Sequence, residues 1–258
     1  MNFSCCIDMM YAGLDFYDRI KAAKDDSVGA VEFWKWSNKD IGKLKDTLDK
    51  NEMKAVLCNL DSSDEELSAA LMRGILSHKR TDDLERAIHE SAPVMRELGF
   101  DKAIVLAGDI DPEIEYEKAI DNIRETLRIG VKAAEDEGIM LVLEPLNSYD
   151  RASYVMPYSA PAFDIVRDIG SQALKVLFDL YHTQRMEGNL IYTLEKEIDH
   201  IGHFHVANSP WRCEPSLGEI DYRQVFGAIE ASGYKYHVGF EYRQKNVDFS
   251  LGEWLGGR

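Results

Sequence analysis

The sequence lacks the motifs of several common α/β enzyme classes. No GxGxxG follows the first predicted strand and no GxxxxGK[ST] occurs anywhere, so neither a Rossmann nor a P-loop fold has motif support. No apolar stretch approaches the roughly 20 residues of a membrane span. The N-terminus has no basic segment followed by a long apolar run, and we therefore expect no signal peptide.

Positive charge is also scarce. The 258 residues include 30 Lys and Arg against 46 Asp and Glu, which gives a formal net charge of −16. Because nucleic acids and anionic membranes attract basic surfaces, this balance argues against both as partners. The four cysteines form no CxxC pair, and we expect reduced thiols in a cytoplasmic protein.

What the chain does contain is an alternation of short apolar runs and amphipathic segments. Strands are predicted at residues 3–8, 29–34, 53–59, 102–108, 139–145, 174–179, 200–207 and 235–242. Helices are predicted after the first seven, at residues 14–24, 39–51, 81–98, 112–135, 160–169, 189–198 and 221–232. This alternation is typical of a parallel sheet, and eight units in about 240 residues favour a (β/α)8 TIM barrel. An open doubly wound sheet is the alternative.

No linker-like stretch divides the chain, and we predict that residues 1–258 form one domain. Residues 61–78 are predicted as an excursion that opens with helix-cap residues. Residues 243–258 are expected to form a C-terminal tail. Its aromatic side chains would pack on the barrel or on a partner subunit, and the second arrangement would make the protein a homo-oligomer.

Titratable side chains fall near the ends of four neighbouring predicted strands: Glu144, Asp179, His205 and Glu241. In an α/β barrel these ends share one rim, where catalytic groups lie. His203 is two residues before His205, so both should face the same side. A single carboxylate here could be solvated or paired with arginine. Three carboxylates and one imidazole together favour Mg²⁺ or Mn²⁺, with Co²⁺ as a further option, whereas zinc prefers more nitrogen or sulfur.

Two motifs are specific, Asp-x-Tyr-His-x-Gln-x-Met-Glu-Gly at residues 179–188 and Arg-x-Glu-Pro-x-x-Gly-Glu at residues 212–219. Further pieces are Val31-Glu32-Phe33, Asn59-Leu60, Arg73-Gly74, Glu144-Pro145-Leu146-Asn147, Gly202-His203 and Glu241-Tyr242. In these residues the chain resembles hydroxypyruvate isomerases, within the xylose-isomerase-like barrel superfamily. The resemblance extends over nearly the whole chain, from about residue 29 to residue 242.

The resemblance implies a divalent metal held by Glu144, Asp179, His205 and Glu241. The adjacent carbonyl and hydroxyl oxygens of a small hydroxy-carbonyl or sugar substrate would chelate it. Glu144 and Glu241 would be the catalytic acid/base pair and would move a proton between neighbouring carbons through a cis-enediolate. The lead reaction is the conversion of hydroxypyruvate to tartronate semialdehyde.

Four more residues are assigned to substrate binding through the same resemblance: His182, Arg212, Asn59 and Glu214. The guanidinium of Arg212 suits a carboxylate such as that of hydroxypyruvate.

The chain also departs from these isomerases. They usually carry Gln where this chain has His205, whereas the related ketose 3-epimerases carry a metal-binding His there. The stretch after Asn59 replaces the isomerases' Pro-Ala-Gly-Asp-Trp pattern with Asp-Ser-Ser-Asp-Glu at residues 61–65. The exact substrate, the physiological metal and the oligomeric state therefore stay open.

Several rival functions remain at this point. The first is a ketose 3-epimerase of the tagatose or psicose type, which His205 favours. A sugar-processing lyase or deglycosidase on the same scaffold is the second. An endonuclease IV-like enzyme would need more histidine ligands and a basic face than seven histidines and a charge of −16 offer. A non-catalytic carbohydrate-binding protein is disfavoured because both Glu144 and Glu241 are present.

Overall fold

The computed structural model describes residues 1–257, and Arg258, the last residue of the predicted tail, lies outside this range. Within residues 1–257, eight parallel strands close into a barrel in chain order. They are β1 (Asn2–Cys6), β2 (Ala30–Phe33), β3 (Lys54–Asn59), β4 (Lys102–Leu106), β5 (Met140–Glu144), β6 (Leu174–Asp179), β7 (Ile201–Val206) and β8 (His237–Phe240). The predicted TIM barrel is confirmed, and the pairing of β1 with β8 rules out the open sheet.

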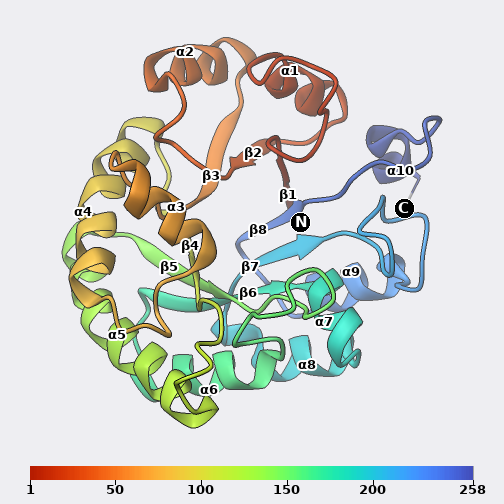
Figure 1. Cartoon of the computed structure of the whole chain (residues 1–258). Coiled ribbons are helices and arrows are strands. Elements are labelled where there is room, and N and C mark those ends of the chain that lie inside the picture. The colour runs from red at the N-terminus through yellow and green to blue at the C-terminus, as the bar shows by residue number, and fades with distance from the viewer. Residues whose placement is uncertain (258) are drawn as a thin grey trace.

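Helices surround the strands on the outside of the barrel (Figure 1). Each of the seven predicted helices is present: α1 (Asp18–Asp25), α2 (Ile41–Asn51), α4 (Thr81–Leu98), α5 (Tyr116–Glu137), α6 (Ser159–Ile169), α8 (Leu190–Glu197) and α9 (Tyr222–Ala231). The apolar residues of α4 recur at helical spacing, so Leu84, Ala87 and Ile88 are all buried. This helix ends at Gly99, whose φ of 79° is the left-handed conformation that glycine adopts without strain.

The helices α3 (Glu65–Arg73), α7 (Leu180–Met186) and α10 (Leu251–Gly256), and the 3₁₀ turn η1 (Ile198–His200), were not predicted. Three of them are short, and their apolar pattern spans two turns or fewer. A capping side chain starts both α3 and α7. Asp64 accepts hydrogen bonds from the backbone N–H groups of Glu66 and Leu67, and the cap of α7 is Asp179.

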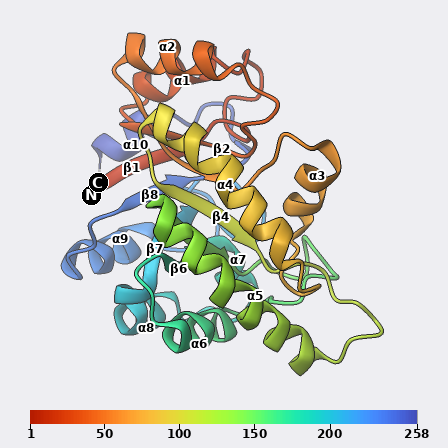
Figure 2. The ribbon, with the colours of Figure 1, turned by 90° about the vertical axis from the view of Figure 1, so that its left-hand side faces the viewer.

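The loops that follow the strands gather at one end of the barrel. In Figure 2, α3 and the long loop after β4 extend on the side opposite the two termini. Because β1 begins at the N-terminus, the side with α3 is the carboxyl-end rim. This rim carries the active site in barrels of this kind.

The C-terminal tail packs on the barrel. The ring of Trp254 in α10 lies 5.9 Å from that of Phe226 in α9 and 6.3 Å from that of Phe240 in β8. Phe249 lies 6.1 Å from Tyr242. The described part of the tail thus closes the outer surface beside β8. Among residues 1–257, no helix has the length and apolar character needed to cross a membrane.

Candidate active site

The four predicted ligand residues converge at the carboxyl-end rim. Glu144 and Asp179 end β5 and β6, His205 lies near the end of β7, and Glu241 follows β8. All four are buried, with at most 6% of their surface exposed. Nδ1 of His205 lies 3.6 Å from Oε1 of Glu144 and 3.6 Å from Oε2 of Glu241. Ligand atoms of Asp179, His205 and Glu241 all lie within 4.8 Å of one another.

The donor atoms of this cluster fit a divalent metal ion. Nδ1 of His205 is buried and has no hydrogen-bond partner among the described residues. Buried polar atoms normally have a partner, so this nitrogen is available to a ligand that the protein itself does not supply. The remaining donors are carboxylate oxygens, which hard cations such as Mg²⁺ and Mn²⁺ prefer. Glu144, Asp179, His205 and Glu241 could therefore hold such an ion together.

The orientation of His205 is fixed by Glu32 of β2. Nε2 of His205 donates to Oε2 of Glu32 at 2.8 Å, and Nε2 of His203 donates to Oε1 at 2.8 Å. Ser4 of β1 also donates to this carboxylate. A carboxylate that accepts from one imidazole nitrogen leaves the other nitrogen free for a metal. Glu32 therefore turns Nδ1 of His205 toward the cluster.

The Glu32 carboxylate carries its charge inside the barrel. Burial raises the pKa of Glu32, but the nearby His203 and His205 lower it by more. The pKa of Glu32 is therefore well below its ordinary range. A glycine in β8 makes room for this group. A Cβ atom on Gly239 would lie 2.1 Å from Oε1 of Glu32, so any other residue here would displace the carboxylate.

Glu241 is held as an anion by two donors. Nε1 of Trp34 donates to Oε1 of Glu241 at 2.8 Å, and Nη2 of Arg212 donates to Oε2. Burial raises the pKa of Glu241, but the positive charge of Arg212 outweighs it, with the help of His205 and the hydrogen bond from Trp34, and the pKa falls to about 2. Glu241 is therefore a carboxylate throughout the neutral range.

The pKa of Glu144 is shifted in the opposite direction, upward. Burial raises the pKa of Glu144 to about 7; His205 opposes this shift, and the negative charges of Glu241 and Asp179 add to it. Near pH 7 this carboxyl group can therefore both hold and release a proton. Two carboxyl groups with pKa values pushed apart by their surroundings are typical of an acid and base working as a pair.

Asp179 has two uses at the end of β6. Its Oδ1 accepts hydrogen bonds from the backbone N–H groups of Tyr181 at 2.7 Å and His182 at 2.9 Å, which starts α7. Its Oδ2 remains on the side of the cluster, 3.6 Å from Nε2 of His182. The cap thus fixes both the aspartate and the predicted substrate-binding histidine that follows it.

His182 presents one nitrogen to the cluster. The backbone N–H of Asn147 donates to its Nδ1 at 3.0 Å, so the ring proton of the neutral imidazole is on Nε2. Burial is the largest cause that lowers the pKa of His182 to about 4, which keeps the ring neutral at pH 7. Nε2 makes no hydrogen bond among the described residues, and Oδ2 of Asp179 lies 3.6 Å from it. Its N–H can therefore donate to an oxygen of a bound molecule.

The other predicted substrate-binding residues lie in three different settings. Arg212 reaches Glu241 from the loop after β7, and its buried Nε has no partner among residues 1–257. Asn59 ends β3, and its Nδ2 contacts Sδ of Met72 at 3.0 Å. Both carboxylate oxygens of Glu214 accept hydrogen bonds from the tail, from the backbone N–H groups of Lys245 and Asn246 at 2.8 Å. Glu214 thus ties the loop that carries Arg212 to the tail.

Two residues that contact the cluster were not predicted as site residues, Glu32 and Trp34. A signal existed for Glu32, since a carboxylate inside the apolar run at residues 30–33 needs a buried partner. Trp34 gave no such signal, because a tryptophan after an apolar strand is expected only to pack against its neighbours.

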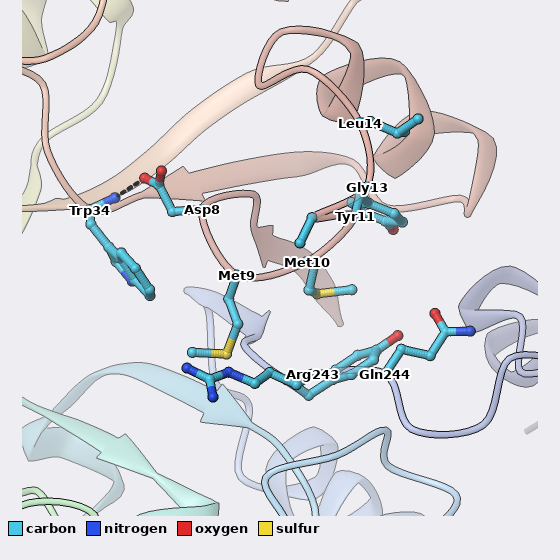
Figure 3. A pocket seen from close by; sticks show the side chains of 11 residues that line it. Asp8, Met9, Met10, Tyr11, Gly13, Leu14, Trp34, Arg243 and Gln244 are labelled. Carbon is cyan, nitrogen blue, oxygen red and sulfur yellow. Dashed lines mark hydrogen bonds between the residues drawn. The ribbon is translucent and has the colours of Figure 1, made fainter.

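A cavity of about 840 Å³ lies between the loops that follow β1 and β8 (Figure 3), and none of the four cluster residues lines it. Its walls are residues 8–14 from the loop after β1, Trp34, and residues 242–244 after β8. Trp34 lines this wall and also donates a hydrogen bond to Glu241, so it links the cavity to the cluster. The volume is within the roughly 300–1,000 Å³ of small-molecule sites.

A closed βα barrel with buried carboxylate and histidine side chains gathered at its carboxyl-end rim is typical of a TIM-barrel enzyme. The family model described as "Xylose isomerase-like TIM barrel" matches residues 15–255, and the chain belongs to this family.

Two named relatives align with nearly the whole chain. The chain is 32% identical to hydroxypyruvate isomerase of Escherichia coli (strain K12) over 256 residues, which cover 99% of this chain and 98% of that protein. It is 31% identical to 2-oxo-tetronate isomerase of Cupriavidus necator, over 98% of this chain and 97% of that protein. The protein is therefore an enzyme of the isomerase type, as the sequence predicted.

Among solved structures, the fold is similar to that of an AP endonuclease, family 2, from Brucella melitensis. The TM-score is 0.84 at 24% identity, and the match covers 100% of this chain and 99% of that chain. At this identity the likeness shows the shared fold alone.

Proposed function

We propose that the protein is a divalent-metal-dependent isomerase that moves a proton between adjacent carbons of a small 2-oxo acid. The observation that carries this proposal is geometric: Glu144 and Glu241 are both buried, and each places a carboxylate oxygen 3.6 Å from the same imidazole nitrogen, Nδ1 of His205. The two named relatives, which isomerise hydroxypyruvate and 2-oxo-tetronate, support a short 2-oxo acid as the substrate. Conversion of hydroxypyruvate to tartronate semialdehyde is the lead reaction.

Mg²⁺ or Mn²⁺ would be held by Glu144, Asp179, His205 and Glu241. When bound, the cation supplies positive charge that stabilises the oxyanion of an enediolate, which lowers the barrier to removing a proton next to a carbonyl.

The proton is moved by the two glutamates. Glu241, which is an anion at neutral pH, takes a proton from the hydroxyl-bearing carbon of the substrate. Glu144 returns a proton to the neighbouring carbon, and the hydroxyl proton of the first carbon passes to the former carbonyl oxygen. Exchange with solvent then restores the starting protonation of both glutamates. Trp34 and Arg212 keep the Glu241 carboxylate in place through both steps. The N–H at Nε2 of His182 donates to a substrate oxygen.

A ketose 3-epimerase is the second candidate, and His205 is the observation that favours it. The same two glutamates would then remove and return a proton at a single carbon from opposite faces. This reaction uses a neutral sugar instead of an acid, so the two candidates differ in substrate charge.

The experiment is an assay of Mg²⁺- or Mn²⁺-loaded protein with hydroxypyruvate, 2-oxo-tetronate, tagatose or psicose, and abasic DNA. We expect turnover of a 2-oxo acid and no cleavage of DNA. Turnover of the ketose alone would establish the epimerase instead. Absence of turnover with every oxo acid and sugar would contradict an isomerase, as would full activity in protein shown to be metal-free.

A further inference from the structure

We propose that Asn147 is a positioning residue that fixes His182 as a hydrogen-bond donor to the substrate and keeps it out of the ligand set of the metal. This inference rests on the proposed function, because it assumes that the cluster holds a divalent ion. It explains how His182 and His205, two buried histidines beside the same carboxylates, have different roles.

Both histidines bring a nitrogen to the carboxylates of the cluster. Ligand atoms of Glu144, Asp179 and His182 all lie within 4.8 Å of one another. Those of Asp179, His205 and Glu241 form a second group of the same size. Nε2 of His182 and Nδ1 of His205 are both buried and make no hydrogen bond within the described part of the chain. Distance and burial alone would therefore allow either histidine to bind the ion.

The far nitrogen of the His205 ring faces an acceptor. This nitrogen, Nε2, donates to the carboxylate of Glu32 at 2.8 Å. The proton of the neutral ring is therefore on Nε2, and a lone pair remains on Nδ1. Because an imidazole nitrogen with a free lone pair can bind a metal ion, His205 is suited to be a ligand.

The far nitrogen of the His182 ring meets donors instead. The backbone N of Asn147 lies 3.0 Å from Nδ1 of His182, and the side-chain Nδ2 of Asn147 lies 2.7 Å from it. Because both groups donate, Nδ1 keeps its lone pair and the ring proton is on Nε2, the nitrogen beside the cluster. A protonated nitrogen cannot bind a metal ion, but it can donate to a substrate oxygen.

The orientation of the Asn147 amide is fixed by the loop that follows it. Its Oδ1 accepts hydrogen bonds from the backbone N–H groups of Tyr149 at 3.0 Å and Asp150 at 2.8 Å. Its Nδ2 also donates to Oδ2 of Asp150 at 3.2 Å. A reversed amide would place its NH₂ group against two N–H donors and its oxygen against a carboxylate. Since Asn147 is 0% exposed, water could not compensate for these lost hydrogen bonds.

The test compares Asn147→Asp with Asn147→Ala. Asn147→Asp keeps the shape of the side chain but places an acceptor beside Nδ1 of His182, so the ring proton can move to Nδ1. Asn147→Ala is the matched control, because it removes the amide and leaves the backbone N–H as a donor to the ring. Neither variant offers Nε2 a new partner.

Two measurements follow the ring and the metal. ¹⁵N NMR of the imidazole nitrogens in metal-free protein shows which nitrogen of His182 carries the proton, with His182→Gln used to assign the signals. Titration calorimetry with Zn²⁺ and with Mn²⁺ gives the ratio of the two affinities. Zinc is the informative metal because it prefers nitrogen ligands more strongly than Mn²⁺ does.

In the wild type we expect a proton on Nε2 of His182 and none on Nδ1, and Nε2 should keep its proton when Mg²⁺ is added. Asn147→Asp should carry a proton on Nδ1. Nε2 is then available as a second nitrogen ligand, and the affinity for Zn²⁺ relative to Mn²⁺ should rise about tenfold. Asn147→Ala should keep the proton on Nε2 and the affinity ratio of the wild type.

A proton on Nδ1 of His182 in the wild type would overturn the proposal, and so would loss of the Nε2 proton when Mg²⁺ binds. Unchanged ring protonation and an unchanged affinity ratio in Asn147→Asp would overturn it as well, as would an equal rise of the ratio in Asn147→Ala. None of these measurements uses turnover. If the wild type converted no 2-oxo acid, the proposed function would fail, and the protonation of His182 would still test the role of Asn147.

Discussion

The two halves of the barrel contribute different side chains at the carboxyl-end rim. The strands of the second half, β5 to β8, lead into the side chains that face one another at the rim: Glu144, Asp179, His205 and Glu241. The first half, β1 to β4, supplies none of these. It supplies Glu32 and Trp34, which hydrogen-bond to His205 and Glu241 from across the barrel. One half carries the proposed chemistry, and the other fixes its geometry.

This difference shows what barrel closure does for the site. Glu32 and His205 are 173 positions apart in the chain, and Trp34 and Glu241 are 207 apart. Only the pairing of β1 with both β2 and β8 brings these side chains together. We therefore expect graded effects of substitution, largest in the second half and smallest at first-half residues that do not contact the cluster.

The largest effect is expected from Glu241→Gln in the second half. Without this base, kcat for hydroxypyruvate should fall by about 10²–10⁴, because proton transfer by a positioned side chain typically contributes that much. Steady-state kinetics measure it, with circular dichroism to show that the fold is intact. Glu219→Gln is the control, since Glu219 is an exposed carboxylate that makes one hydrogen bond with Ser209. An active Glu241→Gln enzyme would remove Glu241 from the mechanism.

Glu32→Gln is expected to have the largest effect in the first half. A neutral amide accepts the Nε2–H of His205 more weakly, so affinity for Mn²⁺ should fall about 10- to 100-fold. Titration calorimetry with Mn²⁺ measures it directly and does not depend on turnover. Ser4→Ala, which removes one hydrogen bond to Glu32, should have a much smaller effect. Unchanged Mn²⁺ affinity in Glu32→Gln would mean that Glu32 does not position His205.

Trp34→Phe should have an intermediate effect on catalysis. It removes the N–H donor to Glu241 while keeping an aromatic wall, and kcat/KM should fall about tenfold. Losing a donor to the charged form raises the pKa of Glu241 from about 2, so activity should be lost at a higher pH on the acidic side. The pH dependence of kcat/KM measures both changes. An acidic limb at the same pH as in the wild type would contradict this role.

The smallest effect on activity is expected from Glu90→Gln, in the first half and outside the cluster. Burial raises the pKa of Glu90, but hydrogen bonds from Ser62, Ser63 and Arg86 lower it to about 2. Because its pKa in the folded state is depressed, Glu90 stabilises the protein above pH 4.5, the ordinary value, and this contribution is lost as pH falls toward 2.

Urea unfolding at pH 7 should show Glu90→Gln to be less stable by about 1–3 kcal/mol. The difference from the wild type should shrink as the pH approaches 2. The kcat and KM of the Glu90→Gln enzyme should match those of the wild type. A stability difference that does not change with pH, or a clear loss of activity, would contradict this assignment.

Much of the fold could be predicted from sequence because a βα barrel repeats one pattern. Apolar runs gave the strands, and residues such as Gly99 marked helix ends. The meeting of Glu144, Asp179 and Glu241 could also be predicted, since strand ends share one rim. Short helices in the loops could not, because a capped segment like α7 is too brief to show a period.

The partners of the site residues could not be predicted in the same way. From the sequence, a buried carboxylate such as Glu32 can be expected to need a partner. The sequence does not show which histidine is that partner. The bond between Trp34 and Glu241 depends on side-chain placement across the closure of the barrel.

The central claim is that Glu144 and Glu241 pass a proton between neighbouring carbons of a 2-oxo acid. Its most direct test is deuterium incorporation by Mn²⁺-loaded protein acting on hydroxypyruvate in D₂O, followed by NMR. The account predicts that the wild type turns over hydroxypyruvate and places solvent deuterium on carbon. Glu241→Gln should neither turn over the substrate nor incorporate deuterium. Turnover by the wild type with no deuterium on carbon would indicate direct hydride transfer between the carbons and would contradict the account.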